Sequence, residues 1–136
     1  MKAKLKTFIR NRAKNCCEYC ISQERFSADS FSIEHIVSLS KGGSSNEQNL
    51  ALSCQGCNNF KYNFIQAIDP ATGAIVPLYN PRLDNWNSHF RYNETFTTII
   101  GISQIGRATA QKLRLNRENL TNLRQVLTLL DLHPPF

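Results

Sequence analysis

The sequence lacks a long apolar run. Nowhere in its 136 residues do about 20 apolar residues follow one another, the length that a membrane-spanning helix needs. The basic start is not followed by a sustained apolar stretch either, so we expect no secretory signal and no membrane partner. Internal repeats and low-complexity segments are also missing. We therefore expect a single compact domain, residues 1–136, in the reducing cytoplasm.

Acidic residues are missing from the beginning of the chain. Residues 1–14 hold six basic side chains and no acid, and the remainder holds ten of each, so the net charge of +6 lies in this segment. A basic arm of this kind suits the phosphate backbone of a nucleic acid, and Lys6, Arg10 and Lys14 are candidate contacts. A solvated helix that only keeps the protein soluble would carry the same charge.

Clear periodicity is confined to short stretches, separated by turns rich in proline, glycine and asparagine. The fold class that we expect is α+β. The expected elements are a basic helix over 2–14, strands over 31–37 and 49–54, a helix over 55–68, one or two helical turns over 84–90, a strand over 95–102, and helices over 104–115 and 117–132.

Four of the five cysteines form two CxxC pairs, which are Cys17 with Cys20 and Cys54 with Cys57. Each pair can supply two corners of a tetrahedron, and four thiolates in a reducing compartment favour a structural Zn²⁺. Ordinary buried cysteines and redox pairs are the alternatives, and two such pairs in one small chain favour zinc over both. Cys16 is left over, because the two-residue spacing favours its neighbour as the ligand.

Four motifs lie between and just after the cysteine pairs: Glu34-His35, Lys41-Gly42-Gly43, Asn49-Leu50 and Cys57-Asn58-x-x-Lys61. In this order they resemble the HNH nuclease family. The resemblance covers Cys17 to about Lys61 and implies a ββα-metal core with a separate four-cysteine zinc knuckle. Residues 1–16 would then be a basic N-terminal arm, 17–68 the knuckle and core, and 69–136 a C-terminal helical extension.

The resemblance also implies roles for single residues. His35 would be the general base, and Glu34 and Asn58 would be ligands of one catalytic divalent ion. Asn49 would be the middle asparagine of the motif, which holds the loop and orients the histidine. Lys61, one helical turn after Asn58, would contact a phosphate. Lys41 in the glycine loop is a further candidate phosphate contact.

The expected chemistry does not depend on the family name. A neutral histidine can take a proton from the attacking water, because its pKa lies near working pH. A hard divalent ion can hold the phosphate and the leaving oxygen with few protein ligands. The sequence departs from the common motif by having Glu34 where aspartate is more frequent and Asn58 where others have histidine. These departures leave Mg²⁺, Mn²⁺ and Ni²⁺ open as the catalytic ion.

The sequence therefore predicts a metal-dependent DNA endonuclease that nicks or cuts duplex DNA, with RNA as substrate and a homodimer left open. The alternative is a zinc-stabilised nucleic-acid-binding module without cleavage. An adaptor that uses the apolar stripe of 120–130 is a third reading, although that stripe is expected to be core. Residues 107–117 hold four basic side chains that could follow DNA phosphates, and we favour a solvated helix face. Asp84 and His89 could hold a second metal, and we favour packing of His89 with Trp86 and Phe90.

Overall fold

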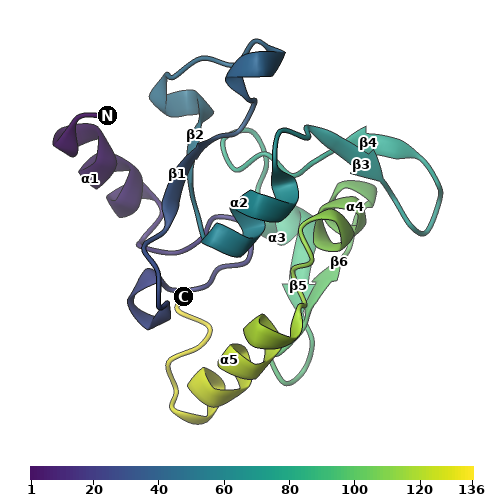
Figure 1. Cartoon of the computed structure of the whole chain (residues 1–136). Helices are drawn as coiled ribbons and strands as arrows, with labels where there is room; N and C mark the ends of the chain where they lie inside the picture. Colours follow the sequence, from purple (N-terminus) through teal and green to yellow (C-terminus); the bar gives the residue numbers. More distant parts are fainter.

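The computed structural model describes the whole chain, from Met1 to Phe136. It is an α+β protein, as the sequence predicts, with three separate two-stranded antiparallel sheets (Figure 1). No helix is long and apolar enough to cross a membrane. The elements are α1 Ala3–Arg12, β1 Ser32–His35, β2 Leu50–Ser53, α2 Gln55–Lys61, β3 Gln66–Ile68, β4 Ile75–Pro77, α3 Trp86–His89, β5 Phe90–Tyr92, β6 Ile99–Gly101, α4 Gln104–Lys112 and α5 Glu118–Leu129, with short 3₁₀ turns at Glu24–Phe26, Leu39–Lys41 and Glu47–Asn49.

The first sheet and α2 make the ββα unit that the sequence predicts. β1 pairs with β2 so that Glu34 faces Ala51 and His35 faces Leu50. β2 is buried along its whole length, because α1 packs against it and α2 covers the neighbouring strand (Figure 1). Cys54 caps the N-terminus of α2, because its sulfur accepts a hydrogen bond of 3.4 Å from the Cys57 amide.

The helix expected over 55–68 is half as long as predicted. α2 ends at Lys61, and Tyr62 has a φ of 50°, outside the helical region. Residues 66–68 instead pair with 75–77 as a hairpin that projects from the body (Figure 1). The turn explains this, because the Asp69 carboxylate accepts hydrogen bonds from the Ala71 amide and the Thr72 hydroxyl. A local turn therefore overrides the helical spacing of the apolar residues.

The C-terminal extension, residues 69–136, contains β4 and α3 and then the β5–β6 hairpin followed by α4 and α5. Both helices are confirmed to within three residues of their expected ends. The strand expected over 95–102 covers only Ile99–Gly101, and its partner β5 was not predicted. Helix α4 lies directly on this hairpin, and a Cβ at Gly106 would come within 1.9 Å of the His89 carbonyl oxygen. Only glycine allows that approach.

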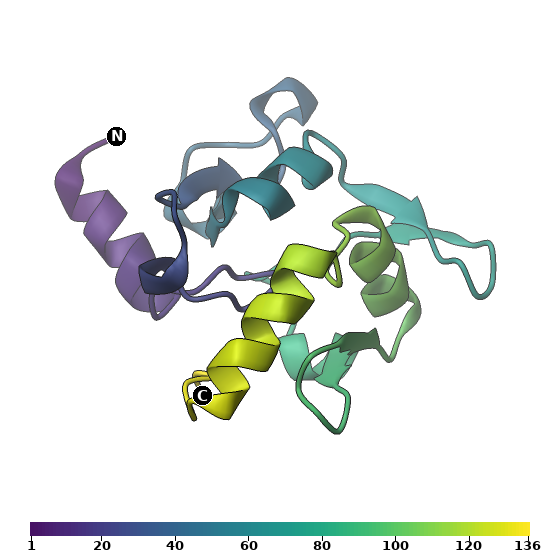
Figure 2. The same cartoon turned by 60° about the horizontal axis from the view of Figure 1, so that its bottom comes forward.

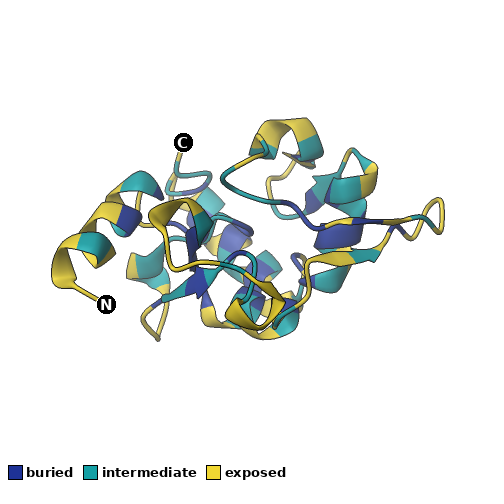
Figure 3. Cartoon of the chain, turned by 90° about the horizontal axis from the view of Figure 1, so that it is seen from above, coloured by how far each residue is buried: buried dark blue, intermediate teal, exposed yellow.

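One hydrophobic core joins the extension to the ββα unit, and the four paired cysteines are part of it. The Trp86 indole donates a hydrogen bond of 3.0 Å to the Tyr19 carbonyl oxygen, and its ring lies 5.1 Å from that of Phe90. Trp86 and Phe90 thus pack together as expected, whereas the His89 ring packs against Tyr79, with the ring centroids 6.0 Å apart. The C-terminal segment returns to the first third of the chain, where Gln23 donates to the Leu132 carbonyl oxygen at 2.7 Å (Figure 2). Seen from above, exposed residues dominate α1 and the tip of the β3–β4 hairpin (Figure 3).

Candidate metal centre and active site

The four paired cysteines converge on one point. All four side chains are buried, none forms a disulfide, and their sulfur atoms lie within 4.8 Å of one another. The sulfurs of Cys20 and Cys54 are 3.7 Å apart. A tetrahedral Zn²⁺ with bonds of about 2.3 Å requires sulfur–sulfur edges of roughly 3.8 Å, so this separation fits the ion. Hydrogen bonds from the other three thiols hold the pKa of Cys54 well below its usual range.

His35 lies at the end of β1, on the face of the strand opposite to Glu34. Its ring is half-buried, and Nε2 lies 3.0 Å from the Ser45 hydroxyl oxygen. Nδ1 has no hydrogen-bond partner in the protein. The histidine is therefore fixed at one nitrogen by the loop and open at the other, which is an arrangement that a general base needs.

Asn49 holds the loop that carries Ser45. Its amide nitrogen donates to the carbonyl oxygens of Val37 at 2.9 Å and Ser44 at 2.7 Å, and its amide oxygen accepts from the Val37 amide at 2.9 Å. Close packing adds to these bonds, because a Cβ at Gly43 would lie 1.8 Å from the Val37 oxygen. Both ends of the Asn49 side chain are thus used inside the protein, and it orients the loop beside His35.

Asn58 lies in the middle of α2, on the side of the helix that also carries Cys54 and Lys61. It is half-buried, and its side chain makes no hydrogen bond to the protein. An amide oxygen without a partner, next to a buried carboxylate-bearing strand, is available as a ligand for a hard cation.

Comparison with known proteins agrees with this geometry. Residues 17–64 match the family model described as HNH endonuclease. We call this matched segment the HNH domain. The matched segment spans both cysteine pairs, the β1–β2 hairpin and α2. Comparisons with curated proteins and with solved structures gave no match.

Within the HNH domain, Glu34 differs from a freely available ligand. Its carboxylate is buried, accepts a hydrogen bond from the Tyr19 hydroxyl and lies 3.3 Å from the Lys61 ammonium. Burial raises the pKa of Glu34, and the nearby Lys61 charge opposes that shift. The carboxylate has further lone pairs for an ion, but Lys61 competes with any cation that binds there.

Lys61 lies in the interior of the protein and not at the surface. We expected a phosphate contact on the surface, but the side chain is 2% exposed and its ammonium donates to the Ile36 carbonyl oxygen at 2.8 Å. The ammonium is thus engaged in the interior, and a direct phosphate contact is excluded in this arrangement. The spacing of Lys61 after Asn58 does not indicate this, because both partners of the ammonium, Glu34 and Ile36, lie on or next to β1.

The other candidate phosphate contacts divide in a similar way. Arg10 donates two hydrogen bonds of 3.0 Å to the Glu24 carboxylate, so it serves to hold α1 and the first 3₁₀ turn together. That pairing occupies two of the Arg10 donors, and a phosphate contact by Arg10 stays a prediction. Lys6, Lys14 and Lys41 are exposed, as a phosphate contact requires.

A basic surface around Phe60 and Phe64 was not predicted from the sequence. Phe64 lies between two lysines, with the Lys112 ammonium 3.7 Å and the Lys41 ammonium 6.0 Å from the ring centroid. Arg114 lies over Phe60 at 4.7 Å. These side chains come from the 3₁₀ turn at Leu39–Lys41, from α2 and the residues just after it, and from the end of α4 and the residues just after it, and only the fold brings them together. The interleaving of cations and aromatic rings is typical of nucleic-acid surfaces.

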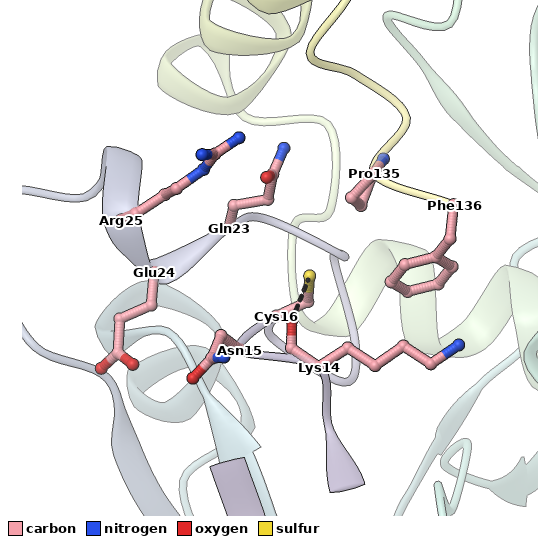
Figure 4. A pocket seen from close by; sticks show the side chains of 8 residues that line it. All are labelled: Lys14, Asn15, Cys16, Gln23, Glu24, Arg25, Pro135 and Phe136. Carbon is pink, nitrogen blue, oxygen red and sulfur yellow. Dashed lines mark hydrogen bonds between the residues drawn. The ribbon is translucent and has the colours of Figure 1, made fainter. Parts of the chain in front are cut away.

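Cys16 is separate from the zinc ligands. It lines a surface pocket of about 590 Å³ with Lys14, Gln23 and Phe136, and its thiol donates to the Lys14 carbonyl oxygen at 3.4 Å (Figure 4). Burial raises the pKa of the Cys16 thiol to about 11. The thiol is therefore protonated at neutral pH and takes no part in the four-cysteine cluster.

Asp84 and His89, considered as a second metal site, bond to different local groups. The Asp84 carboxylate accepts from the Asn80 amide at 2.9 Å, and His89 Nδ1 lies 2.6 Å from the Ser103 hydroxyl oxygen. Each side chain therefore has its own local partner. The His89 ring also packs edge-on against Tyr79.

Proposed function

We propose that this protein is a divalent-metal-dependent DNA endonuclease that hydrolyses phosphodiester bonds. The observation that carries the proposal is the HNH domain at residues 17–64, in which His35 lies beside a loop fixed by Asn49. The exposed cations Lys41 and Arg114 and the half-buried Lys112, which lie over Phe64 and Phe60, support a polyanionic substrate.

His35 is the general base in this proposal. Ser45 holds Nε2, so Nδ1 is the nitrogen that takes a proton from the attacking water. Asn49 acts through the loop, because its three hydrogen bonds fix the backbone on both sides of the glycine turn. The role of Asn49 is to position His35.

Glu34 and Asn58 would hold the catalytic ion, Mg²⁺ or Mn²⁺, with Ni²⁺ as a further candidate. A bound divalent ion supplies Lewis acidity at the phosphate and at the leaving oxygen. The donor types fit such an ion, since one is a carboxylate and the other an amide oxygen without a protein partner. Lys61 would have to yield part of its contact with Glu34, which at 3.3 Å is longer than its 2.8 Å hydrogen bond to the Ile36 carbonyl oxygen.

A second candidate function is nucleic-acid binding without cleavage, with the zinc knuckle as a scaffold. It is favoured by the same ion pair, because Lys61 already neutralises the carboxylate that the catalytic ion needs.

The two functions separate in a plasmid assay. Zinc-loaded protein is incubated with supercoiled plasmid in Mg²⁺, in Mn²⁺ and in a chelator that is removed before electrophoresis. The endonuclease predicts relaxed circles or linear DNA only with the added ion, and ends that DNA ligase reseals because they carry 5′-phosphate and 3′-hydroxyl groups. Retarded but intact plasmid under every condition would establish the binding module instead. The ratio of circles to linear product reports nicking or double-strand cleavage.

A further inference from the structure

Arg117 reaches the cysteine cluster from outside the HNH domain. It lies between α4 and α5, and its guanidinium donates to the sulfur of Cys54 at 3.3 Å and to that of Cys57 at 3.7 Å. The HNH match ends at residue 64, so this contact belongs to neither the family motif nor the CxxC pairs. The sequence suggested a solvated helix face for Arg117, and the structure shows a half-buried side chain.

The guanidinium is held in place by three other groups. Nη1 donates to the carbonyl oxygens of Leu113 at 3.3 Å and Arg114 at 3.1 Å, which lie at the end of α4. Its plane lies 5.7 Å from the Phe60 ring on α2. A single side chain thus connects the C-terminal turn of α4 with the thiolates at the start of α2.

Gly56 makes room for this contact. A Cβ at position 56 would lie 2.5 Å from Arg117 Nη2 and 2.8 Å from Cζ. Gly56 lies inside α2, where alanine is otherwise the better helix former. Of the two residues between the cysteines of the second pair, Gly56 is therefore the one that leaves room for a guanidinium against its backbone.

The Arg117 contact matters because of the net charge of the zinc site. A Zn²⁺ bound by four thiolates has a net negative charge, and a buried net charge is costly unless a partner compensates it. Hydrogen bonds to metal-bound groups from outside the ligand shell also orient the ligands and strengthen metal binding. Arg117 is the cation that the structure places at this position, and its two donors reach both sulfurs of the second CxxC pair.

We propose that Arg117 is a positioning residue of the zinc site, which slows zinc release and couples metal binding to docking of the C-terminal extension. By this coupling, zinc stabilises the docked α4–α5 segment, and the docked segment retains zinc. The proposal concerns the zinc site alone, so its failure would leave the proposed endonuclease activity unaffected.

The test measures zinc release into an excess of a chromogenic chelator, at fixed pH, with stoichiometry confirmed first. Arg117→Ala is expected to release zinc about 10–100-fold faster than the wild type, the usual effect of removing a partner of a metal ligand. Arg114→Ala is the matched control, because Arg114 lies over the same Phe60 ring but does not touch a sulfur. It is expected to stay within about two-fold of the wild type.

Gly56→Ala keeps the proposal testable if Arg117→Ala folds poorly. The added methyl group displaces the guanidinium while leaving every cysteine and Arg117 in the chain, so release is again expected to be faster. The double variant Gly56→Ala/Arg117→Ala should release zinc no faster than Arg117→Ala, because both changes remove one interaction. Equal release by the wild type, Arg117→Ala and Gly56→Ala would overturn the proposal. An equal acceleration by Arg114→Ala would overturn it too, because the effect would then not depend on the sulfur contacts.

Discussion

Replacing Lys61 with methionine tests the interior of the HNH domain most sharply. The change keeps an unbranched apolar chain of similar length and removes the ammonium that lies 3.3 Å from Glu34. Glu34 would keep only its hydrogen bond from Tyr19, and its side chain is 4% exposed. The Ile36 carbonyl oxygen would lose its donor as well.

The size of the expected destabilisation follows from the burial of both Lys61 and Glu34. Removing one partner of a buried ion pair costs about 3–5 kcal/mol, whereas an exposed pair contributes about 0–1 kcal/mol. At about 2.1 cal/mol/K per residue, the 136-residue chain has an unfolding entropy of roughly 0.29 kcal/mol/K. The loss of Lys61 should therefore lower Tm by roughly 10–17 °C.

The assay is thermal unfolding followed by circular dichroism at pH 7, with zinc bound. Lys41→Met is the matched control, since Lys41 is exposed and its loss should change the free energy of unfolding by no more than about 0.5 kcal/mol. Glu34→Gln/Lys61→Met should be less destabilised than the sum of the single variants, because the two charges interact. If Lys61→Met unfolds within about 2 °C of the wild type but binds DNA less tightly, Lys61 is a surface phosphate contact and the structural account of it is wrong.

Three further predictions concern the zinc ligands, the hairpin turn and the loop beside His35. Cys17→Ser should lose the stoichiometric zinc that Cys16→Ser retains, as metal analysis after gel filtration would show; the reverse result would reassign the ligand. Two hydrogen bonds from Arg107 hold the pKa of the Asp69 carboxyl well below its usual range. The stabilisation from this pair is therefore present above the unfolded-state pKa of about 3.9 and falls as the pH drops below that value. Asp69→Asn should therefore lower Tm at pH 7 and flatten the decline of Tm at acid pH, and an unchanged acid profile would count against that pairing. Gly43→Ala should reduce nicking and stability far more than Gly42→Ala, because only the former places a Cβ against backbone atoms; the latter, at φ 87°, should cost about 1–2 kcal/mol.

The elements and motifs of the HNH domain could be predicted from local sequence, because its candidate functional residues lie at turns and at the ends of helices and strands. The spacing of Cys17 and Cys20 requires a tight turn whatever the fold, and the same holds for the second pair. The strand that ends in His35 and the loop closed by Asn49 are likewise local features, with their main contacts 10–12 residues apart.

Contacts across the chain could not be predicted in this way. Lys61 faces Glu34 and Ile36 across the ββα unit, and Arg117 lies about 60 residues from the thiolates that it contacts. Nothing in the neighbourhood of either residue distinguishes an interior cation from a surface one. The apolar stripe of α5 shows the same limit, since Leu120 and Leu127 are buried while Val126 is 54% exposed. Packing of Leu120 into the common core selects the inward face, and periodicity alone does not.

The central claim is that His35 acts as the base of a phosphodiester hydrolase. Its most direct test is the initial rate of supercoiled plasmid loss for His35→Gln beside His89→Gln, each zinc-loaded and supplied with the ion that supports the wild type. His89 packs in the extension and bonds to Ser103, away from the loop, so His89→Gln should nick at close to the wild-type rate. His35→Gln should be slower by at least about 100-fold, the usual contribution of a general base. Equal nicking rates for the two variants, or no metal-dependent nicking by the wild type, would contradict the account.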